Sequence, residues 1–309
     1  MRNAFIEELV ELAGIHDHIA LVVGDLGYSV IEPFADRFPE RFINAGVAEQ
    51  NMTGLAAGMA SEGYHVFTYS IANFPTFRCA EQIRNDVDYH RLPVTVVAVG
   101  GGLAYGALGY SHHAVQDYAL MRSFPNMLIA APGDPMEVRA CMRYLVAHPQ
   151  PSYLRLGKAG EPNFHSTVPE VQPGRWLKVA DSQRSADGKR TLLSTGATLG
   201  LAMNWRNAPE YEQHSVYSLP LWSMASKAEQ VNAAQNFDEI VTLEDHLVDG
   251  GFGSWMMEAI VGKPCVGARI EVHGLKSDVC GTVGSQSTLN TLGGLGMYGE
   301  LKTMQVKSS

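Results

Sequence analysis

The stretch that decides the fold of this chain is Arg41-Phe42-Ile43-Asn44-Ala45-Gly46-Val47-Ala48-Glu49-Gln50-Asn51-Met52. It places the carboxylate of Glu49 at the start of a predicted helix, 48–61, which continues with small glycine and alanine side chains. Small side chains let a second backbone or a flat ligand approach a helix closely. A glutamate at this position also favours the helix dipole by itself. In this setting we expect Glu49 to face a bound group rather than solvent.

Outward from this stretch, short apolar strands alternate with helical segments, a pattern typical of parallel sheets covered by helices. We predict an α/β protein with two domains, each a mostly parallel sheet flanked by helices. In the first half the pattern predicts strands at 20–23, 66–69, 94–99, 127–130 and 153–156, and helices at 4–12, 48–61, 77–89, 113–121 and 135–147. In the second half it predicts strands at 191–194, 215–218, 240–243 and 268–271, and helices at 197–205, 225–234, 252–260 and 286–292.

A segment rich in proline, glycine and charged residues separates the two halves. We therefore predict a first domain at 1–160, a linker at 161–189 and a second domain at 190–309. A chain of 309 residues with 46% hydrophobic content can bury two ordinary cores.

Composition and charge exclude several classes of function. The formal net charge is −9, from 23 basic and 32 acidic residues without a basic stripe, so nucleic acid is not expected as a partner. Four cysteines without paired spacing (Cys79, Cys141, Cys265 and Cys280) indicate reduced thiols. The first residues do not resemble a secretory signal, and glycines interrupt the longest apolar stretch, 92–110. We expect a cytoplasmic protein that is not inserted in a membrane.

Polar and aromatic side chains follow successive strands of the predicted first sheet. Asp25 follows the first strand, Phe74 and Phe77 come after the second, and His112 and His113 close the glycine-rich loop after the third. Each has an ordinary structural explanation alone, as a turn residue, a core ring or a loop histidine. Open α/β sheets bind ligands at the carboxyl ends of their strands. Together these groups can hold a flat, nitrogen-rich heterocycle and move protons around it.

The combined motifs resemble the C-terminal half of transketolase, which consists of a pyrimidine-binding domain and a C-terminal domain. The resemblance covers nearly the whole chain. In the first domain it rests on Phe42-Ile43-Asn44-Ala45-Gly46-Val47-Ala48-Glu49-Gln50-Asn51, Phe74-Pro75-Thr76-Phe77, Gly109-Tyr110-Ser111-His112-His113, Ser123-Phe124-Pro125-Asn126-Met127 and Ala131-Pro132-Gly133-Asp134. In the second domain it rests on Thr242-Leu243-Glu244-Asp245-His246 and Gly250-Gly251-Phe252-Gly253-Ser254.

The resemblance implies thiamine diphosphate as the cofactor. In such enzymes the glutamate at the position of Glu49 hydrogen-bonds the aminopyrimidine ring and stabilises the imino tautomer that activates the thiazolium carbon. It also implies that Phe74 stacks on the pyrimidine ring. Phe77 and Ile71 would complete the apolar wall, and Asp25 would lie at the same rim.

For the substrate, the resemblance implies sugar phosphates and the transfer of a two-carbon ketol unit. His112 would act near the reacting carbonyl with His113 beside it, while Arg2, Ser29 and Lys158 would surround a sugar phosphate. Lys158 stands where many relatives have arginine, and the two cations recognise phosphate differently.

Two positions depart from the family pattern. Leu108 replaces an aspartate that reads a substrate hydroxyl, and Gly100 stands where a second histidine is expected. Without these polar groups, we expect a donor or acceptor other than the common pentose and heptose phosphates.

The chain also lacks the Gly-Asp-Gly sequence that holds the divalent ion of the cofactor in this family. Magnesium prefers carboxylate and phosphate oxygens. We therefore expect Mg²⁺ or Ca²⁺ to be held mainly by a separate subunit, the N-terminal, diphosphate-binding half of a split transketolase, in an α2β2 assembly.

Two other functions stay open at this stage. One is the β subunit of a thiamine-dependent 2-oxo-acid dehydrogenase, which has both domains and also needs a partner. Ala48-Glu49-Gln50-Asn51 and Tyr153-Leu154-Arg155-Leu156-Gly157-Lys158 read more like transketolase or deoxyxylulose-phosphate synthase. The other is a non-catalytic scaffold subunit that keeps the architecture without turnover.

Overall fold

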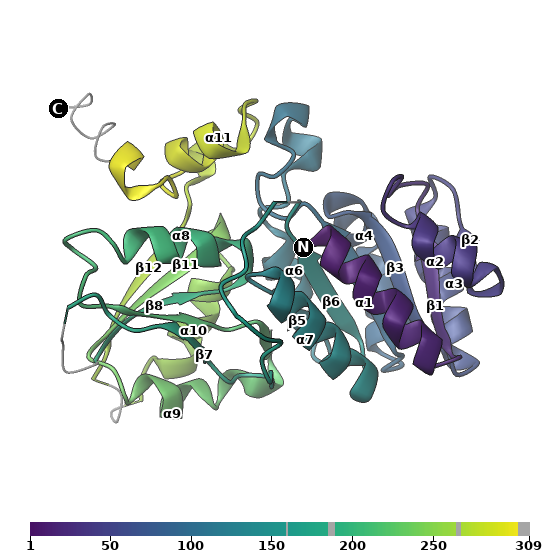
Figure 1. Cartoon of the computed structure of the whole chain (residues 1–309), viewed down its shortest axis with the longest axis horizontal. Coiled ribbons are helices and arrows are strands. Elements are labelled where there is room, and N and C mark those ends of the chain that lie inside the picture. The colour runs from purple at the N-terminus through teal and green to yellow at the C-terminus, as the bar shows by residue number, and fades with distance from the viewer. Residues whose placement is uncertain (159, 185–188, 264–266, 302–309) are drawn as a thin grey trace.

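The computed structural model describes residues 1–158, 160–184, 189–263 and 267–301. It contains two sheets flanked by helices, which confirms the α/β class (Figure 1). Strands β1, Ile19–Val23, and β4, Val94–Val99, are buried along their whole length, and all their residues are apolar except Thr95. Continuous apolar strands of this kind belong to parallel sheets that are covered on both faces.

The first sheet has seven strands in the order β10-β5-β6-β4-β3-β1-β2. All neighbouring pairs are parallel except β10 with β5, which is antiparallel. The strands are β1 Ile19–Val23, β2 Phe42–Asn44, β3 His65–Ile71, β4 Val94–Val99, β5 Leu128–Ala130, β6 Ser152–Leu156 and β10 Leu221–Ser223.

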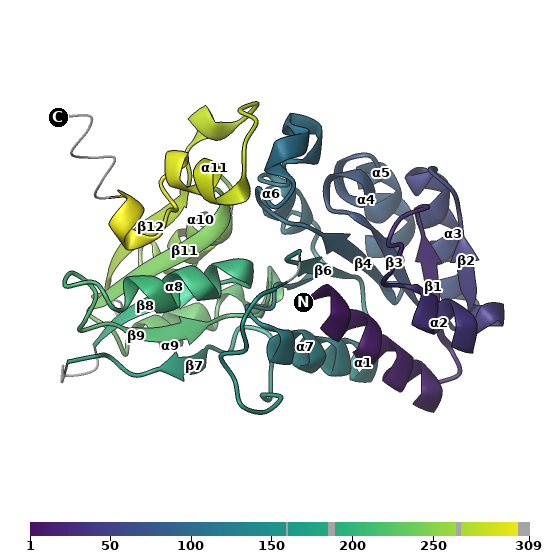
Figure 2. The same ribbon diagram turned by 45° about the horizontal axis from the view of Figure 1, so that its top comes forward.

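Helices cover both faces of this sheet. Helices α1, Arg2–Ile15, and α7, Pro135–Ala147, lie beside each other on one face (Figures 1 and 2). Asp134 caps α7 by accepting a hydrogen bond from the Glu137 N–H at 2.7 Å. The remaining helices of this half are α2 Glu32–Arg37, α3 Glu49–Ser61, α4 Asn73–Phe77, α5 Ala80–Gln82 and α6 Asp117–Met121.

The second sheet has five strands in the order β12-β11-β8-β9-β7, and only the β7 edge is antiparallel. Its strands are β7 Leu177–Ala180, β8 Arg190–Ser194, β9 Ser215–Ser218, β11 Glu239–Leu247 and β12 Arg269–Leu275. The accompanying helices are α8 Leu199–Trp205, α9 Gln230–Ala234, α10 Phe252–Ile260 and α11 Gln286–Leu292.

Several elements differ from the sequence-based prediction. Strands β2, β7 and β10 were not predicted, and β7 lies inside the segment 161–189 that was predicted to be a linker. These strands have three or four residues, too few to show a periodic apolar pattern. The helix predicted at 77–89 is divided among α4, α5 and a π-helical segment, Ile83–Asp88. Of the helix predicted at 113–121, only α6 is helical. The residues before it form a loop with an isolated β-bridge at Ala114.

The two halves share a continuous core. Strand β10 comes from the second half but pairs with β5 of the first sheet. Its Trp222 ring lies 5.3 Å from the ring of Tyr118 and 5.2 Å from that of Trp255, so side chains of both halves pack together. This packing fixes the second half against the first sheet.

A buried ion network reinforces this junction. Arg155, on β6, donates from Nε to Asp117 at 2.6 Å and from Nη1 to Asp245 of β11 at 2.5 Å. The guanidinium carbon also lies 4.4 Å from the ring centroid of Tyr118. Sequence reasoning did not single out Arg155, because its two acidic partners are far away along the chain.

Among the described residues, no helix is both long and apolar enough to cross a membrane. Cys79 and Cys141 are buried free thiols and Cys280 is a half-buried one, whereas Cys265 lies outside the described residues.

Candidate active site

The candidate site lies at the carboxyl edge of the first sheet. Parallel register pairs Val23 of β1 with Tyr69 of β3, and Val99 of β4 with Ile71 of β3 and Leu156 of β6. The segments that leave these strands therefore start at one edge, as open α/β sheets require of a ligand site.

Glu49 begins helix α3 and is almost completely buried, with 1% of its surface exposed. Its Cγ packs against Gly24, where an added Cβ atom would lie 3.6 Å away. One carboxylate oxygen, Oε2, accepts a hydrogen bond from Arg78 Nη1 at 2.6 Å. The other oxygen, Oε1, is buried and has no hydrogen-bond partner among the described residues. Such a group favours a donor supplied by a ligand.

Arg78 connects this carboxylate to the aromatic wall. Its guanidinium carbon lies 4.8 Å from the centroid of the Phe74 ring, while 47% of its side chain stays exposed. The helical backbone at 73–78 places residues four apart on one face, which brings Arg78 over Phe74. Sequence analysis did not identify Arg78, although the spacing from Phe74 was the signal that could have found it.

Three other residues, Phe77, Ile71 and Asp25, were also expected at the cofactor. Phe77 is 40% exposed, and Ile71 is half-buried at the end of β3. Asp25 adopts a left-handed conformation with φ 54°, and its Oδ1 accepts hydrogen bonds from Asn44 Nδ2 and the Tyr28 hydroxyl, each at 2.9 Å. These bonds, Asn44 first, lower the pKa of Asp25.

The two loop histidines, His112 and His113, lie in different surroundings. The His112 ring is half-buried, lies 5.2 Å from the ring of Phe74, and bonds through Nδ1 to Ser111 Oγ at 3.0 Å. Desolvation, and then the neighbouring His113, lower the pKa of His112. His113 is buried, and its Nε2 bonds to the carbonyl of Gly106 at 3.3 Å. The structure thus brings His112, but not His113, against the aromatic wall.

A basic corner lies at the same edge. Lys158 is exposed just after β6, and its Nζ lies 5.2 Å from the ring of Tyr105, which also faces His112 at 6.4 Å. Arg2 is half-buried at the start of α1, with its Nε atom buried and unpaired among the described residues. Ser29 is exposed in a left-handed conformation, and its N–H donates to Glu32 at 2.7 Å.

Comparison with known proteins assigns the family. The description "Transketolase, pyrimidine binding domain" matches residues 1–160. The chain belongs to the transketolase family. It is similar to one of the subunits of the apulose-4-phosphate transketolase of Phocaeicola vulgatus, with 32% identity over 85% of this chain and 84% of that protein. It is also similar to 1-deoxy-D-xylulose-5-phosphate synthase of Desulforudis audaxviator, with 29% identity over 88% of this chain but 43% of the longer enzyme.

A solved structure supports the same assignment. The chain is similar to a split gene transketolase described as an inactive β4 tetramer, with a TM-score of 0.81 and 30% identity over 98% of this chain and 96% of that one. The chain therefore matches, along nearly its whole length, a protein encoded by a split transketolase gene.

The residues present fit the cofactor that the transketolase family uses. Thiamine diphosphate carries an aminopyrimidine ring, and a donor on such a ring can bond to the buried Oε1 of Glu49, which has no partner among the described residues. Arg78, which holds the other oxygen, lies over the ring of Phe74. Among the described residues there is no group of three or more His, Cys, Asp or Glu side chains arranged to hold a metal ion.

The structure also explains one departure from the transketolase pattern. Gly100 has φ 79°, and a Cβ atom there would lie 2.1 Å from the Tyr105 ring. A larger residue at this position would have to displace that ring, so Tyr105 occupies the space that a side chain at position 100 would take. The other departure, Leu108, is 57% exposed in the short helix Gly106–Leu108. Tyr105 was not identified from the sequence.

Proposed function

We propose that this chain is the β-type subunit of a split, thiamine-diphosphate-dependent transketolase. The reaction breaks a carbon–carbon bond of a ketose phosphate, releases an aldose two carbons shorter, and joins the two-carbon ketol unit to an aldehyde acceptor. Thiamine diphosphate, when bound, supplies the carbon nucleophile for this exchange. The relatives that form separate subunits support the split arrangement.

The proposal rests on how the two oxygens of the Glu49 carboxylate are hydrogen-bonded. Arg78 holds Oε2 at 2.6 Å, while the buried Oε1 stays free of partners in the described chain. Fixing one oxygen orients the other, so that it can share a proton with a ring nitrogen. Phe74, with Ile71 and Phe77 beside it, would pack on the same ring, and Asp25 would close the rim.

For the substrate, we propose that His112 lies near the reacting carbonyl. Its lowered pKa favours a neutral ring that can accept or donate a proton. Lys158 and Arg2, with Ser29 at the edge of the rim, would attract the sugar phosphate. His113 would hold the loop in place through the Gly106 carbonyl. Tyr105 would add a hydroxyl near position 100.

The partner would be the N-terminal, diphosphate-binding half of the enzyme. We propose an α2β2 assembly in which that subunit holds Mg²⁺ or Ca²⁺ on the diphosphate. The exposed apolar residues beside the site, Val47 and Tyr28 among them, support a subunit contact at this rim.

Cofactor titration of the separate and mixed subunits tests this function. Calorimetry with thiamine diphosphate and Mg²⁺ should detect binding only after the purified chain is mixed with a diphosphate-binding half. The mixture should then convert a ketose phosphate rather than a 2-oxo acid, as measured by product analysis. Tight cofactor binding by the isolated chain, or turnover of a 2-oxo acid alone, would contradict the proposal.

Substitution of Arg78 tests how the carboxylate is oriented. In Arg78→Met the side chain still covers Phe74, but Glu49 Oε2 loses its donor, so we expect turnover of the reconstituted enzyme to fall by roughly 10-fold or more. The free energy of unfolding should also fall, by about 1–3 kcal/mol, because the buried Oε2 of Glu49 loses its donor. Arg84→Met, in the π-helical segment Ile83–Asp88 and bonded only to Asn85 among the described side chains, is the matched control. Equal turnover of both variants would remove Arg78 from the mechanism.

A further inference from the structure

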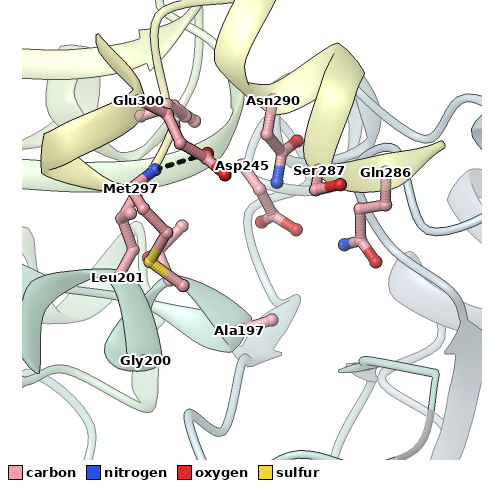
Figure 3. Close-up of a pocket in the computed structure, with 12 residues that line it drawn as sticks. Ala197, Gly200, Leu201, Asp245, Gln286, Ser287, Asn290, Met297 and Glu300 are labelled. Carbon is pink, nitrogen blue, oxygen red and sulfur yellow. Dashed lines mark hydrogen bonds between the residues drawn. The ribbon is translucent and has the colours of Figure 1, made fainter. Parts of the chain in front are cut away.

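A cavity of about 390 Å³ lies in the second half of the chain. One wall comes from Ala197, in the short helix Gly196–Thr198, and from Leu201 near the start of α8, and the other comes from α11 and the turn after it (Figure 3). Figure 3 shows Asp245, from β11, between the two walls. The volume is in the range of pockets that bind small molecules. None of the residues assigned above to cofactor or substrate lines this cavity.

Two buried acceptor atoms belong to residues that line this cavity and lack partners. Asp245 is 3% exposed; its Oδ1 is held by Arg155 at 2.5 Å, but its Oδ2 has no hydrogen-bond partner among the described residues. Asn290 Oδ1 is likewise buried and unpaired in the described chain. Buried oxygens without donors are unfavourable and rare in native proteins. A ligand with N–H or O–H donors would satisfy both.

The charge of the cavity restricts that ligand. Its described lining includes the carboxylates of Asp245 and Glu300 and no lysine, arginine or histidine. Behind the wall, the single positive charge of Arg155 is shared by Asp117 and Asp245, so the network keeps a negative excess. An anion such as a sugar phosphate would be repelled here, whereas a cation would be attracted.

The rest of the lining is apolar. Leu201, Leu295 and Met297 contribute aliphatic surface beside the acceptors. A short hydrocarbon stem would pack on these side chains while a charged head reaches the oxygens. We propose that the cavity binds a small aliphatic amine in its ammonium form, with the ammonium group donating to Asp245 Oδ2 and Asn290 Oδ1.

Titration of the full chain with three probes of equal length tests the charge requirement. At 0.15 M salt, where weak surface attraction is screened, 1,4-diaminobutane should raise the melting temperature in a saturable manner. The neutral 1,4-butanediol and the anionic succinate should not. An equal shift with butanediol or succinate, or a larger one with Mg²⁺, would overturn the proposal.

Two variants locate the binding. Asn290→Leu removes one acceptor without breaking a side-chain bond, and Ala197→Leu fills the cavity; each should raise the dissociation constant of diaminobutane roughly 10-fold or more. Asn232→Leu, an exposed position on α9, is the matched control and should leave the constant unchanged. If all three variants bind the diamine equally, it is attracted to the acidic surface in general and the assigned cavity is wrong.

Discussion

Glu49→Gln should lower the turnover of the reconstituted enzyme by at least about 100-fold, the scale of a lost general acid–base group. Glutamine keeps the shape of the side chain, and its carbonyl oxygen can still accept the hydrogen bond from Arg78. It cannot take up and return a proton. The loss should therefore appear in kcat at saturating cofactor, measured as ketol transfer from a ketose phosphate.

Assembly should survive this substitution. We expect the Glu49→Gln chain to associate with its partner subunit as the unmodified chain does, measured by analytical ultracentrifugation. Glu62→Gln is the matched control, because Glu62 is an exposed glutamate at the opposite end of the same helix. Turnover of Glu49→Gln close to that of Glu62→Gln would eliminate the proposed activation step and favour the scaffold alternative.

Arg155→Met should cause the largest loss of stability in this chain, about 3–5 kcal/mol in the free energy of unfolding. The substitution leaves two buried carboxylates, Asp117 and Asp245, without the guanidinium that both of them bind. It also removes the hydrogen bond from Arg155 Nη2 to the Ala114 carbonyl at 2.9 Å. Urea denaturation followed by tryptophan fluorescence measures the effect, since Trp222 and Trp255 are buried near this network.

A matched control separates burial from the loss of charge alone. Arg143 on α7 also forms an ion pair, with Glu8 at 2.6 Å, but half of its side chain is exposed. Arg143→Met should cost only about 1 kcal/mol, because the guanidinium is half-exposed and Arg139 still pairs with Glu8 at 3.0 Å. Adding Asp117→Asn and Asp245→Asn to Arg155→Met should restore part of the stability, because the uncompensated charges are then gone. Equal losses for Arg155→Met and Arg143→Met would show that the junction does not depend on the buried network.

Much of the site was predictable because its signals are local. The 42–51 stretch placed Glu49 at a helix start, and the phenylalanines and histidines followed predicted strands. The sequence did not indicate which distant residues each of these side chains contacts. Arg78 became visible only when the structure showed its guanidinium hydrogen-bonded to Glu49. Tyr105 became visible only when its ring was found against Gly100.

The sequence by itself determined the alternation of strands and helices and the residues at the strand ends, because periodicity and motifs depend on near neighbours. Only the tertiary structure decided the pairing of β10 with the first sheet, the burial of His113, and the network around Arg155. These features join residues up to 90 positions apart, as Arg155 and Asp245 are. Their energies arise from burial and charge compensation between distant segments, which no local pattern records.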